Sequence, residues 1–241
     1  MRDPVAWQLA LIMVAIFAGA IVQGSVGFGF ALVSAAAVGL IQPDAIPATL
    51  LLLSFPVNVF IGVRERRALD VVALREVTVG LMLGTPVGAM VLIMVPGELL
   101  VAAFGAAIVA AAGISIARPR AEPGTRGRVV AGAVSGVIST VASTGGPPIA
   151  LLFQRRPGPQ LRATLAAAFF VSATLSTIGV TVAGRLGWQQ ARLALFSLPA
   201  LVAGLVLSGP IGRCVDDRWL RPAVLVFAVG SGVAAIIRVL V

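Results

Sequence analysis

The stretch VASTGGPPIALLFQRRPG, from Val141 to Gly158, interrupts a long apolar sequence with two adjacent glycines and two adjacent prolines. Proline cannot donate a backbone hydrogen bond, and its ring clashes with the preceding turn of a helix. It is nevertheless favoured in the first turn of a helix, where those donors are free anyway. The stretch therefore predicts that one helix ends near Ala142 and a short new helix starts at about Pro147. Ser143 and Thr144 are the expected N-caps of the new helix.

The composition of the whole chain predicts a membrane protein. Of its 241 residues, 59% are hydrophobic and only 11% are charged, with a mean hydropathy of +1.06, whereas soluble domains carry about 25% charged residues. Apolar runs long enough to cross a bilayer core of roughly 30 Å recur along it. We expect an all-α polytopic membrane protein with no separate soluble domain. The expected apolar segments are residues 5–23, 28–41, 45–63, 77–95, 99–117, 129–142, 148–153, 163–183, 191–207 and 220–241.

The two halves of the chain resemble each other. GAIVQGSVGFG (Gly19–Gly29) aligns with GVISTVASTGG (Gly136–Gly146), and IPATL (Ile46–Leu50) aligns with LRATL (Leu161–Leu165). Gly84 likewise falls opposite Gly204, so that all three matches have spacings of 115 to 120 residues. Their common order predicts a duplication, with a helix break at the same place in each half.

The arginines predict the orientation of the two halves. The net charge of +9 comes from arginine alone among the basic residues, and the arginines cluster at segment ends. They are therefore expected to orient the chain in the membrane rather than to bind nucleic acid. With Arg64–Glu76 in the cytoplasm, fourteen arginines lie inside and four outside. This assignment predicts two inverted repeats of about five legs, each with a broken or re-entrant helix pair: residues 1–117, a cytoplasmic connection at 118–128, and residues 129–241.

The matched breaks are the candidate binding site. Irregular backbone in a bilayer must be buried in protein or line a wet cavity, so the two breaks should meet in the interior. Helix N-termini and free glycine N–H groups suit an anion. The amides of Gln23 and Asn58 need partners in hydrocarbon, and Gln23 aligns with Thr140. The candidate substrate-binding residues are Gln23, Ser25, Gly27, Phe28, Gly29, Asn58, Thr140, Ser143, Thr144, Gly145 and Gly146.

Several other classes of site do not fit the residues. All nine acidic residues lie at or near segment ends, whereas a cation transporter normally needs a buried carboxylate. With no histidine and only one cysteine, Cys214, the chain offers no nucleophile–base pair, metal cluster or internal disulfide. We therefore expect no catalytic site, no metal and no cofactor. The small residues at Gly132 and Gly136 are expected to serve close helix packing.

Four stretches carry a resemblance to a known family: GAIVQGSVGFGFALV (19–33), TGGPPIALL (144–152), RATLAAAFFVSATLSTI (162–178) and RLGWQQARLALFSLPALVAGLVLSGPIG (185–212). From about Gly19 to Gly232 the chain resembles the TauE/SafE family of sulfite and organosulfonate exporters. The resemblance implies a bacterial inner-membrane permease with duplicated halves that moves small sulfur-containing anions, often outward. The sulfur chemistry is implied by this resemblance alone. Phe28 and Phe30 stand where the family is often richer in glycine, which points to a different pocket size and a different anion.

The leading hypothesis is a secondary transporter, expected to act as an exporter, for a sulfur oxyanion or organosulfonate held near the midplane. Its expected partners are this small anion and the lipid bilayer, and the close-packing patterns permit a homodimer. Two alternatives remain: an anion channel, which would conduct far faster than a carrier, and a non-transporting assembly partner of another membrane protein. The residues leave the identity of the anion and the coupling ion open.

Overall fold

The computed structural model describes residues 6–94, 106, 109, 124–143, 145–153 and 156–214, and the regular elements in these ranges are all helices. The all-α prediction is thus confirmed for this part of the chain. Apart from residues 106 and 109, the expected segment at 99–117 lies outside the described ranges, as do the segment at 220–241 and the connection before residue 124. The elements are α1 (Ala6–Val26), α2 (Phe30–Ile41), a 3-10 turn (Pro43–Ala45), α3 (Ala48–Glu65), a second 3-10 turn (Arg66–Ala68), α4 (Val71–Met94), α6 (Thr125–Ala142), α7 (Gly146–Phe153), α8 (Gly158–Val182) and α9 (Trp188–Cys214).

Five of these helices are long and apolar enough to cross a membrane: α1, α3 with the turn that follows it, α4, α8 and α9 as far as Pro210. Their outward faces remain apolar. On α4, for example, Leu83, Val87 and Met90 recur every three or four residues and are each more than half exposed. Such a stripe on the outside of a bundle is suited to lipid rather than water. The protein is therefore a membrane protein.

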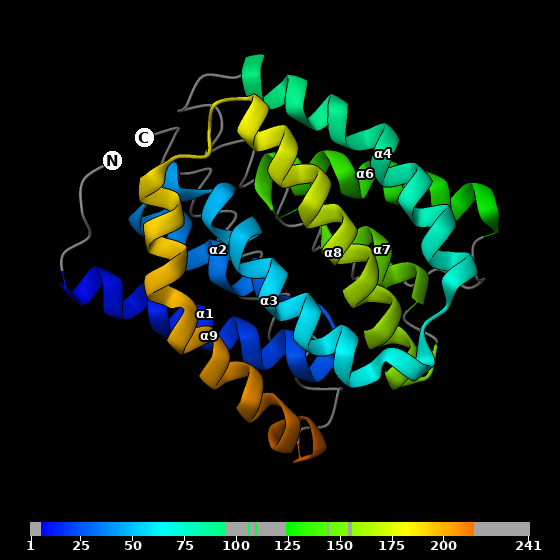
Figure 1. The fold of residues 1–241 in the computed structure, drawn as a ribbon, viewed down its shortest axis with the longest axis horizontal. Coiled ribbons are helices and arrows are strands. Elements are labelled where there is room, and N and C mark those ends of the chain that lie inside the picture. The colour runs from blue at the N-terminus through cyan, green and yellow to red at the C-terminus, as the bar shows by residue number, and fades with distance from the viewer. Residues whose placement is uncertain are drawn as a thin grey trace.

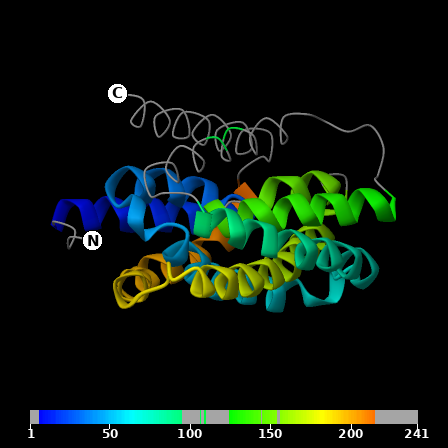
Figure 2. The ribbon, with the colours of Figure 1, turned by 90° about the horizontal axis from the view of Figure 1, so that it is seen from above.

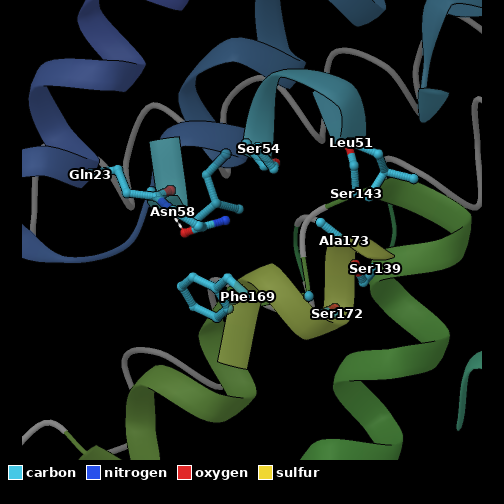
Figure 3. Close-up of a pocket in the computed structure, with 14 residues that line it drawn as sticks. Gln23, Leu51, Ser54, Asn58, Ser139, Ser143, Phe169, Ser172 and Ala173 are labelled. Atoms are coloured by element: carbon cyan, nitrogen blue, oxygen red, sulfur yellow. Dashed lines mark hydrogen bonds between the residues drawn. The ribbon is translucent and has the colours of Figure 1, made fainter. Parts of the chain in front are cut away.

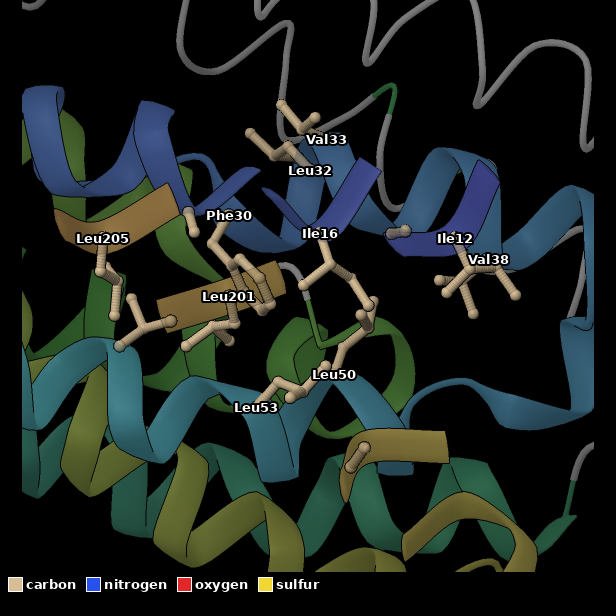
Figure 4. Packing of buried hydrophobic residues seen from close by; sticks show 14 of the residues in the cluster. Ile12, Ile16, Phe30, Leu32, Val33, Val38, Leu50, Leu53, Leu201 and Leu205 are labelled. Carbon is tan, nitrogen blue, oxygen red and sulfur yellow. The ribbon is translucent and has the colours of Figure 1, made fainter. Parts of the chain in front are cut away.

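The helices form two layers (Figures 1 and 2). One layer holds α3, α4, α8 and α9, and the other holds α1, α2, α6 and α7. The broken pairs α1–α2 and α6–α7 thus share one layer, and the long helices that follow each pair cover them. A core of side chains from α1, α2, α3 and α9, including Ile16, Phe30, Leu50 and Leu201, holds the first broken pair in place (Figure 4).

The two halves are interleaved across the layers. α4 packs most extensively against α6, and α9 packs most extensively against α1, so each of these long helices covers the first helix of the other half. Glycines make both contacts close, since a Cβ at Gly84 would collide with the backbone of Ala133, and one at Gly204 with the backbone of Phe17. Gly132 likewise meets the backbone of α4, which confirms the predicted packing role of the small residues on α6.

The matched helices α3 and α8 lie side by side and run antiparallel. Phe55 stacks edge-on against Phe170 with ring centroids 5.6 Å apart. Further along α3, Glu65 pairs with Arg162, which lies nearer the start of α8. Residue numbers therefore rise along one helix as they fall along the other.

Two matched threonines brace one half against the other. Thr49 of α3 donates its hydroxyl to the carbonyl of Gln190, at the start of α9 (3.3 Å). Thr164 of α8 accepts a hydrogen bond from the N–H of Asp70, at the start of α4 (3.1 Å). Both threonines belong to the repeated ATL motif. The exchange of corresponding contacts supports the predicted duplication, while the inverted orientation of the whole repeats stays a prediction.

Ion pairs join the charged segments that the arginine count places on one side of the membrane. They connect the end of α3 and the start of α4 with the starts of α6 and α8. The pairs are Arg162–Glu65 (3.0 Å), Arg156–Asp70 (3.7 Å) and Arg128–Glu76 (2.7 Å).

Candidate functional site

The first helix break is made by glycines. α1 continues to Val26, three residues beyond its predicted end, and α2 starts at Phe30. Gly27 and Gly29 between them have φ values of 97° and 113°. These left-handed conformations are readily adopted only by glycine, so Gly27 and Gly29 make the tight backbone of the break. α2 then folds back along α1, where Ser34 hydrogen-bonds the carbonyl of Ala15.

Two buried side-chain amides connect this break to α3. The Gln23 Oε1 accepts the N–H of Phe30, the first residue of α2, at 3.1 Å. The Gln23 Nε2 donates to the Asn58 Oδ1 at 3.0 Å. Gln23 and Asn58 are only 5% and 2% exposed. The sequence-based expectation that these amides need partners is met for Gln23 and for the Asn58 Oδ1, which bond each other.

The N-terminus of α2 supplies further donors. Its first internal hydrogen bond runs from the Val33 N–H to the Gly29 carbonyl (3.0 Å). The N–H groups of Ala31 and Leu32 precede this bond and therefore have no acceptor within the helix. Both residues lie in the lining of the cavity described below.

A guanidinium covers the end of α1. Arg64, on the last turn of α3, donates its Nη2 to the carbonyl of Gly24 at 2.6 Å, and its Nη1 lies 3.5 Å from the hydroxyl of Ser208. The last carbonyls of a helix lack partners within it, and a cation there also matches the negative end of the helix dipole. Arg64 thus fixes the end of α1 at the break.

The second break is made differently. α6 ends at Ala142, as predicted, and α7 begins at Gly146. Ser143 takes a left-handed conformation (φ 53°) and is the C-cap of α6, with its N–H bonded to the Ser139 carbonyl at 2.7 Å. The prediction that Ser143 would be the N-cap of α7 is wrong, because its hydroxyl bonds the Ala142 carbonyl at the end of α6 instead. Thr144 lies outside the described residues.

Gly145 is required here for space, and Gly146 lies close to a side chain of α8. The carbonyl of Gly145 accepts the hydroxyl of Ser135, and a Cβ at Gly145 would lie 2.7 Å from the Cβ of Ser139. A Cβ at Gly146 would lie 3.3 Å from the ring of Phe169. The two glycines therefore let the break pass close to α6 and α8.

A small cavity of about 40 Å³ lies between the two breaks (Figure 3). Figure 3 shows Ser54 and Asn58 of α3 on one side of it and Phe169, Ser172 and Ala173 of α8 on the other. Its lining contains no charged side chain. The lining residues are Gln23, Gly29, Ala31, Leu32, Leu51, Ser54, Asn58, Ser139, Ser143, Gly145, Gly146, Phe169, Ser172 and Ala173.

Six of the eleven candidate residues lie in this lining. They come from both breaks and from α3: Gln23, Gly29, Asn58, Ser143, Gly145 and Gly146. Residues more than a hundred positions apart in the chain are therefore brought together, as the matched breaks predict.

The other described candidates make different contacts. Ser25 donates its hydroxyl to the Ser208 carbonyl at 3.2 Å. Gly27 packs against Arg162, and Phe28 belongs to a buried apolar cluster with residues of α4, α7 and α8. The structure therefore places these three residues of the first break outside the cavity lining.

Thr140, the partner of Gln23 in the repeat alignment, also lies outside the lining. Its hydroxyl bonds the Gly136 carbonyl of its own helix at 2.9 Å and the Ser176 hydroxyl of α8 at 3.0 Å. The short side chain is satisfied close to its own backbone, whereas the longer amide of Gln23 reaches across to α3.

Sequence reasoning missed Ser54, Phe169 and Ser172 as lining residues. The repeat held a signal that identifies two lining positions of α8. The ATL motif recurs 115 residues later, at Thr164 after Thr49, and the same spacing takes Ser54 to Phe169 and Asn58 to Ala173. All four of these positions line the cavity.

Two polar groups in the lining have no hydrogen-bond partner. They are the Asn58 Nδ2 and the Ser172 Oγ, and both atoms are buried. Buried polar groups in native proteins are nearly always paired, so these two mark a place where a ligand or water is expected. The amide N–H₂ donates and the hydroxyl can donate, so this part of the cavity is suited to an acceptor such as an anion. Among the described residues, no group of three His, Cys, Asp or Glu side chains could hold a metal ion.

Comparison with known proteins identifies a family for this chain. The family described as "Sulfite exporter TauE/SafE" matches residues 11–235, nearly the whole chain. No curated protein and no solved structure matches the chain. The family is one of membrane exporters of sulfite and related sulfur anions, which are transporters and not enzymes. The chain, with its several membrane-spanning helices, belongs to the TauE/SafE sulfite exporter family.

Proposed function

We propose that this protein is a secondary transporter that exports a small sulfur oxyanion or organosulfonate across the bacterial inner membrane. We further propose that the anion binds in the cavity between the two helix breaks. The observation that carries the proposal is the pair of buried, unpartnered groups in the lining, the Asn58 Nδ2 and the Ser172 Oγ.

The chemistry of the lining favours an anion over a cation. A buried donor without a partner costs about 1–3 kcal/mol, and a hydrogen bond to a charged group contributes about 1.5–3 kcal/mol. An anion bound here would receive hydrogen bonds from Asn58, from Ser172 and from the first N–H groups of α2. It would also lie at the positive end of that helix. A cation would find no carboxylate in the lining.

The size of the cavity favours a compact ligand. A cavity needs roughly 10–15 Å³ to hold one water molecule, so the cavity of about 40 Å³ has room for about three waters or a small oxyanion. A longer organosulfonate would require Phe169 to move, because its ring lines the cavity close to Gly146. Sulfite and thiosulfate therefore fit the described cavity better than taurine does.

The position of the cavity favours a carrier over a channel. Its lining comes from both halves, and two broken helix pairs meet there. This is the arrangement that secondary transporters use to expose one midplane site to either side in turn. Because no carboxylate or histidine lines the cavity, coupling to protons would have to use the substrate itself. Sodium or the membrane potential are the other possible driving forces.

The binding test is thermal stabilisation of the purified protein by sulfite, sulfate, thiosulfate, sulfoacetate, taurine, acetate and phosphate. We expect a sulfur oxyanion to stabilise the wild type. The Kd for this anion should rise at least about tenfold in Asn58→Ala and in Ser172→Ala, since each variant loses a hydrogen bond to a charged ligand. Gly146→Leu is expected to abolish the stabilisation by filling the cavity. Thr174→Ala and Gly62→Leu are the matched controls. Thr174 lies outside the cavity lining and bonds the Phe170 carbonyl of its own helix, and nothing lies within 4 Å of a Cβ at Gly62.

Equal stabilisation of wild type and all three cavity variants would contradict this site, and no stabilisation by any anion would contradict the proposed substrate class. Flux into vesicles then separates the mechanisms. We expect carrier-like turnover that saturates with the anion, measured with and without a pH gradient. Ionic conductance far above that turnover would identify a channel, and binding without flux would identify an assembly partner.

A further inference from the structure

The hydrogen-bonded amides of Gln23 and Asn58 have a fixed direction. The first of these hydrogen bonds comes from the N–H of Phe30, which can only donate, so Gln23 must turn its Oε1 toward it (3.1 Å). The Nε2 of Gln23 then faces Asn58, and since that group also only donates, Asn58 must present its Oδ1 (3.0 Å). The Nδ2 of Asn58 is therefore the group left over.

This direction decides which end of the Asn58 amide is free. A carboxamide has a donor end and an acceptor end of nearly the same shape, and hydrogen bonding alone selects between them. Asn58 is 2% exposed and lines the cavity, so its free end is available only to whatever occupies that cavity. Figure 3 shows the bond from Gln23 reaching the oxygen of Asn58, with the nitrogen on the other side of the amide.

From this geometry we propose that Gln23 is a positioning residue that sets the ion selectivity of the cavity. The Phe30 N–H fixes the orientation of the Gln23 amide, and Gln23 in turn fixes the orientation of the Asn58 amide, so that Asn58 presents N–H₂ to the ligand. We call these two linked hydrogen bonds the relay. Reversal of this relay would present the Asn58 Oδ1 instead and would disfavour an anion. The inference rests on the proposed function, because it takes the cavity as the anion site.

The charged side chains at this end of α1 are engaged elsewhere. Arg64 bonds the Gly24 carbonyl, and Glu65 is paired with both Arg64 and Arg162. α2, which receives the first hydrogen bond of the relay, has no charged residue in its sequence. The direction of the amide chain is thus set by the backbone N–H of Phe30 and not by a neighbouring charge.

The variant Gln23→Glu tests the relay because its carboxyl changes role with protonation. When ionised, it can accept from Phe30 but cannot donate to Asn58, so the Asn58 amide is expected to rotate and present Oδ1 to the cavity. When protonated, the acid accepts from Phe30 through one oxygen and donates its O–H to Asn58, which restores the original direction. The two protonation states of this one side chain therefore make opposite predictions for the group that Asn58 presents to the cavity.

The measurement is the Kd for thiosulfate and for sulfate, whose charges stay constant, at about pH 8 and about pH 5. We expect Gln23→Glu to weaken binding at least about tenfold at the higher pH and to recover most of it at the lower pH. Wild type and Gln8→Glu, the same exchange elsewhere on α1, are expected to bind alike at both values. Recovery at low pH is the sign of a relay, because a merely structural defect would persist.

Asn58→Asp tests the same relay from its other end and serves if Gln23→Glu fails to fold. Its carboxylate still accepts from Gln23, but it presents an acceptor to the cavity until it is protonated. The same loss and recovery are expected. Binding unchanged in both variants, or a loss that is equal at both pH values, would overturn the relay. A wild type that binds no anion would instead overturn the proposed function, and the inference with it.

Discussion

The two helix breaks occupy matched places in the chain but are built from different chemistry. At the first, left-handed glycines make the turn, and backbone N–H groups, a side-chain amide and the guanidinium of Arg64 hold it. At the second, Ser143 makes the turn, the hydroxyl of Ser135 bonds Gly145, and two prolines open the next helix. Because proline has no N–H, the start of α7 offers fewer donors than the start of α2.

The two breaks are therefore duplicated in position but contribute different groups to the cavity. The first break supplies the donors that an anion would need, through the α2 N-terminus and Asn58. The second supplies space and shape, because Gly145 and Gly146 let the chain pass close to α6 and to Phe169. Variants at the two breaks should accordingly fail in different ways.

The largest effect on stability is expected for Gly145→Ala. A Cβ there would collide with the backbone of Ser135 and lie 2.7 Å from the Cβ of Ser139, so α6 and α7 would have to separate. Overpacking of this kind costs about 3 kcal/mol. The thermal unfolding midpoint in detergent, compared with that of Gly62→Ala, measures the loss. A midpoint equal to that of the control would show that the second break has room to spare.

A smaller loss is expected for Gly27→Ala at the first break. Its φ of 97° costs an L residue about 1–2 kcal/mol, and the added Cβ would lie 2.9 Å from the Cγ and 3.3 Å from the backbone Cα of Arg162, which is paired with Glu65. Gly184→Ala is the matched control, because it combines a positive φ with open space. Gly27→Ala should unfold at a lower temperature than this control, because only Gly27 has close neighbours. Equal midpoints would show that Arg162 moves aside without cost.

A loss of about 1 kcal/mol is expected for Arg64→Met, which removes the guanidinium from the Gly24 carbonyl. The effect is modest because the Arg64 side chain is 30% exposed and water can replace it. Hydrogen exchange of the last amides of α1 should become faster, while exchange at the start of α7 should not change. Arg66→Met, at an exposed neighbouring position, is the control. Unchanged exchange in α1 would show that the break holds without this cap.

The smallest effect is expected for Pro148→Ala, which returns an N–H to the second break. If the first break already supplies the essential donors, the Kd for the bound anion should change by less than about threefold, below the value of one new charge-assisted hydrogen bond. Calorimetric titration of wild type and variant measures it. A tenfold gain in affinity would show instead that the missing donor limits binding.

The sequence predicted the positions of the breaks well because glycine and proline act locally. The end of α6 at Ala142 and the turn at Gly27–Gly29 both follow from backbone constraints that one or two residues impose. The inner face of each helix was much harder to predict. In a bilayer both lipid and protein core are apolar, so hydrophobic periodicity does not separate the two. Ser54 and Ser172 were missed for this reason.

Side-chain length explains why Thr140 does not line the cavity although the repeat alignment places it opposite Gln23. The repeat alignment placed it opposite Gln23, and its position in the helix does correspond. Its hydroxyl, however, is short enough to bond the carbonyl one turn earlier, as serine and threonine commonly do in apolar helices. The alignment of a repeat thus predicts the backbone position of a side chain. The length of the side chain and the hydrogen-bond partners close to it decide which groups it contacts.

The interleaved packing of α4 with α6 and of α9 with α1 has a mechanical consequence. Motion that preserves these tight glycine contacts cannot divide the molecule at the middle of the chain. Such motion would keep α1 with α9 as one body and α4 with α6 as the other. α3 and α8, which pack against each other, would connect the two bodies, because Thr49 of α3 bonds the start of α9 and Thr164 of α8 bonds the start of α4. Cross-links within either body should therefore leave flux intact, and cross-links between the bodies should stop it.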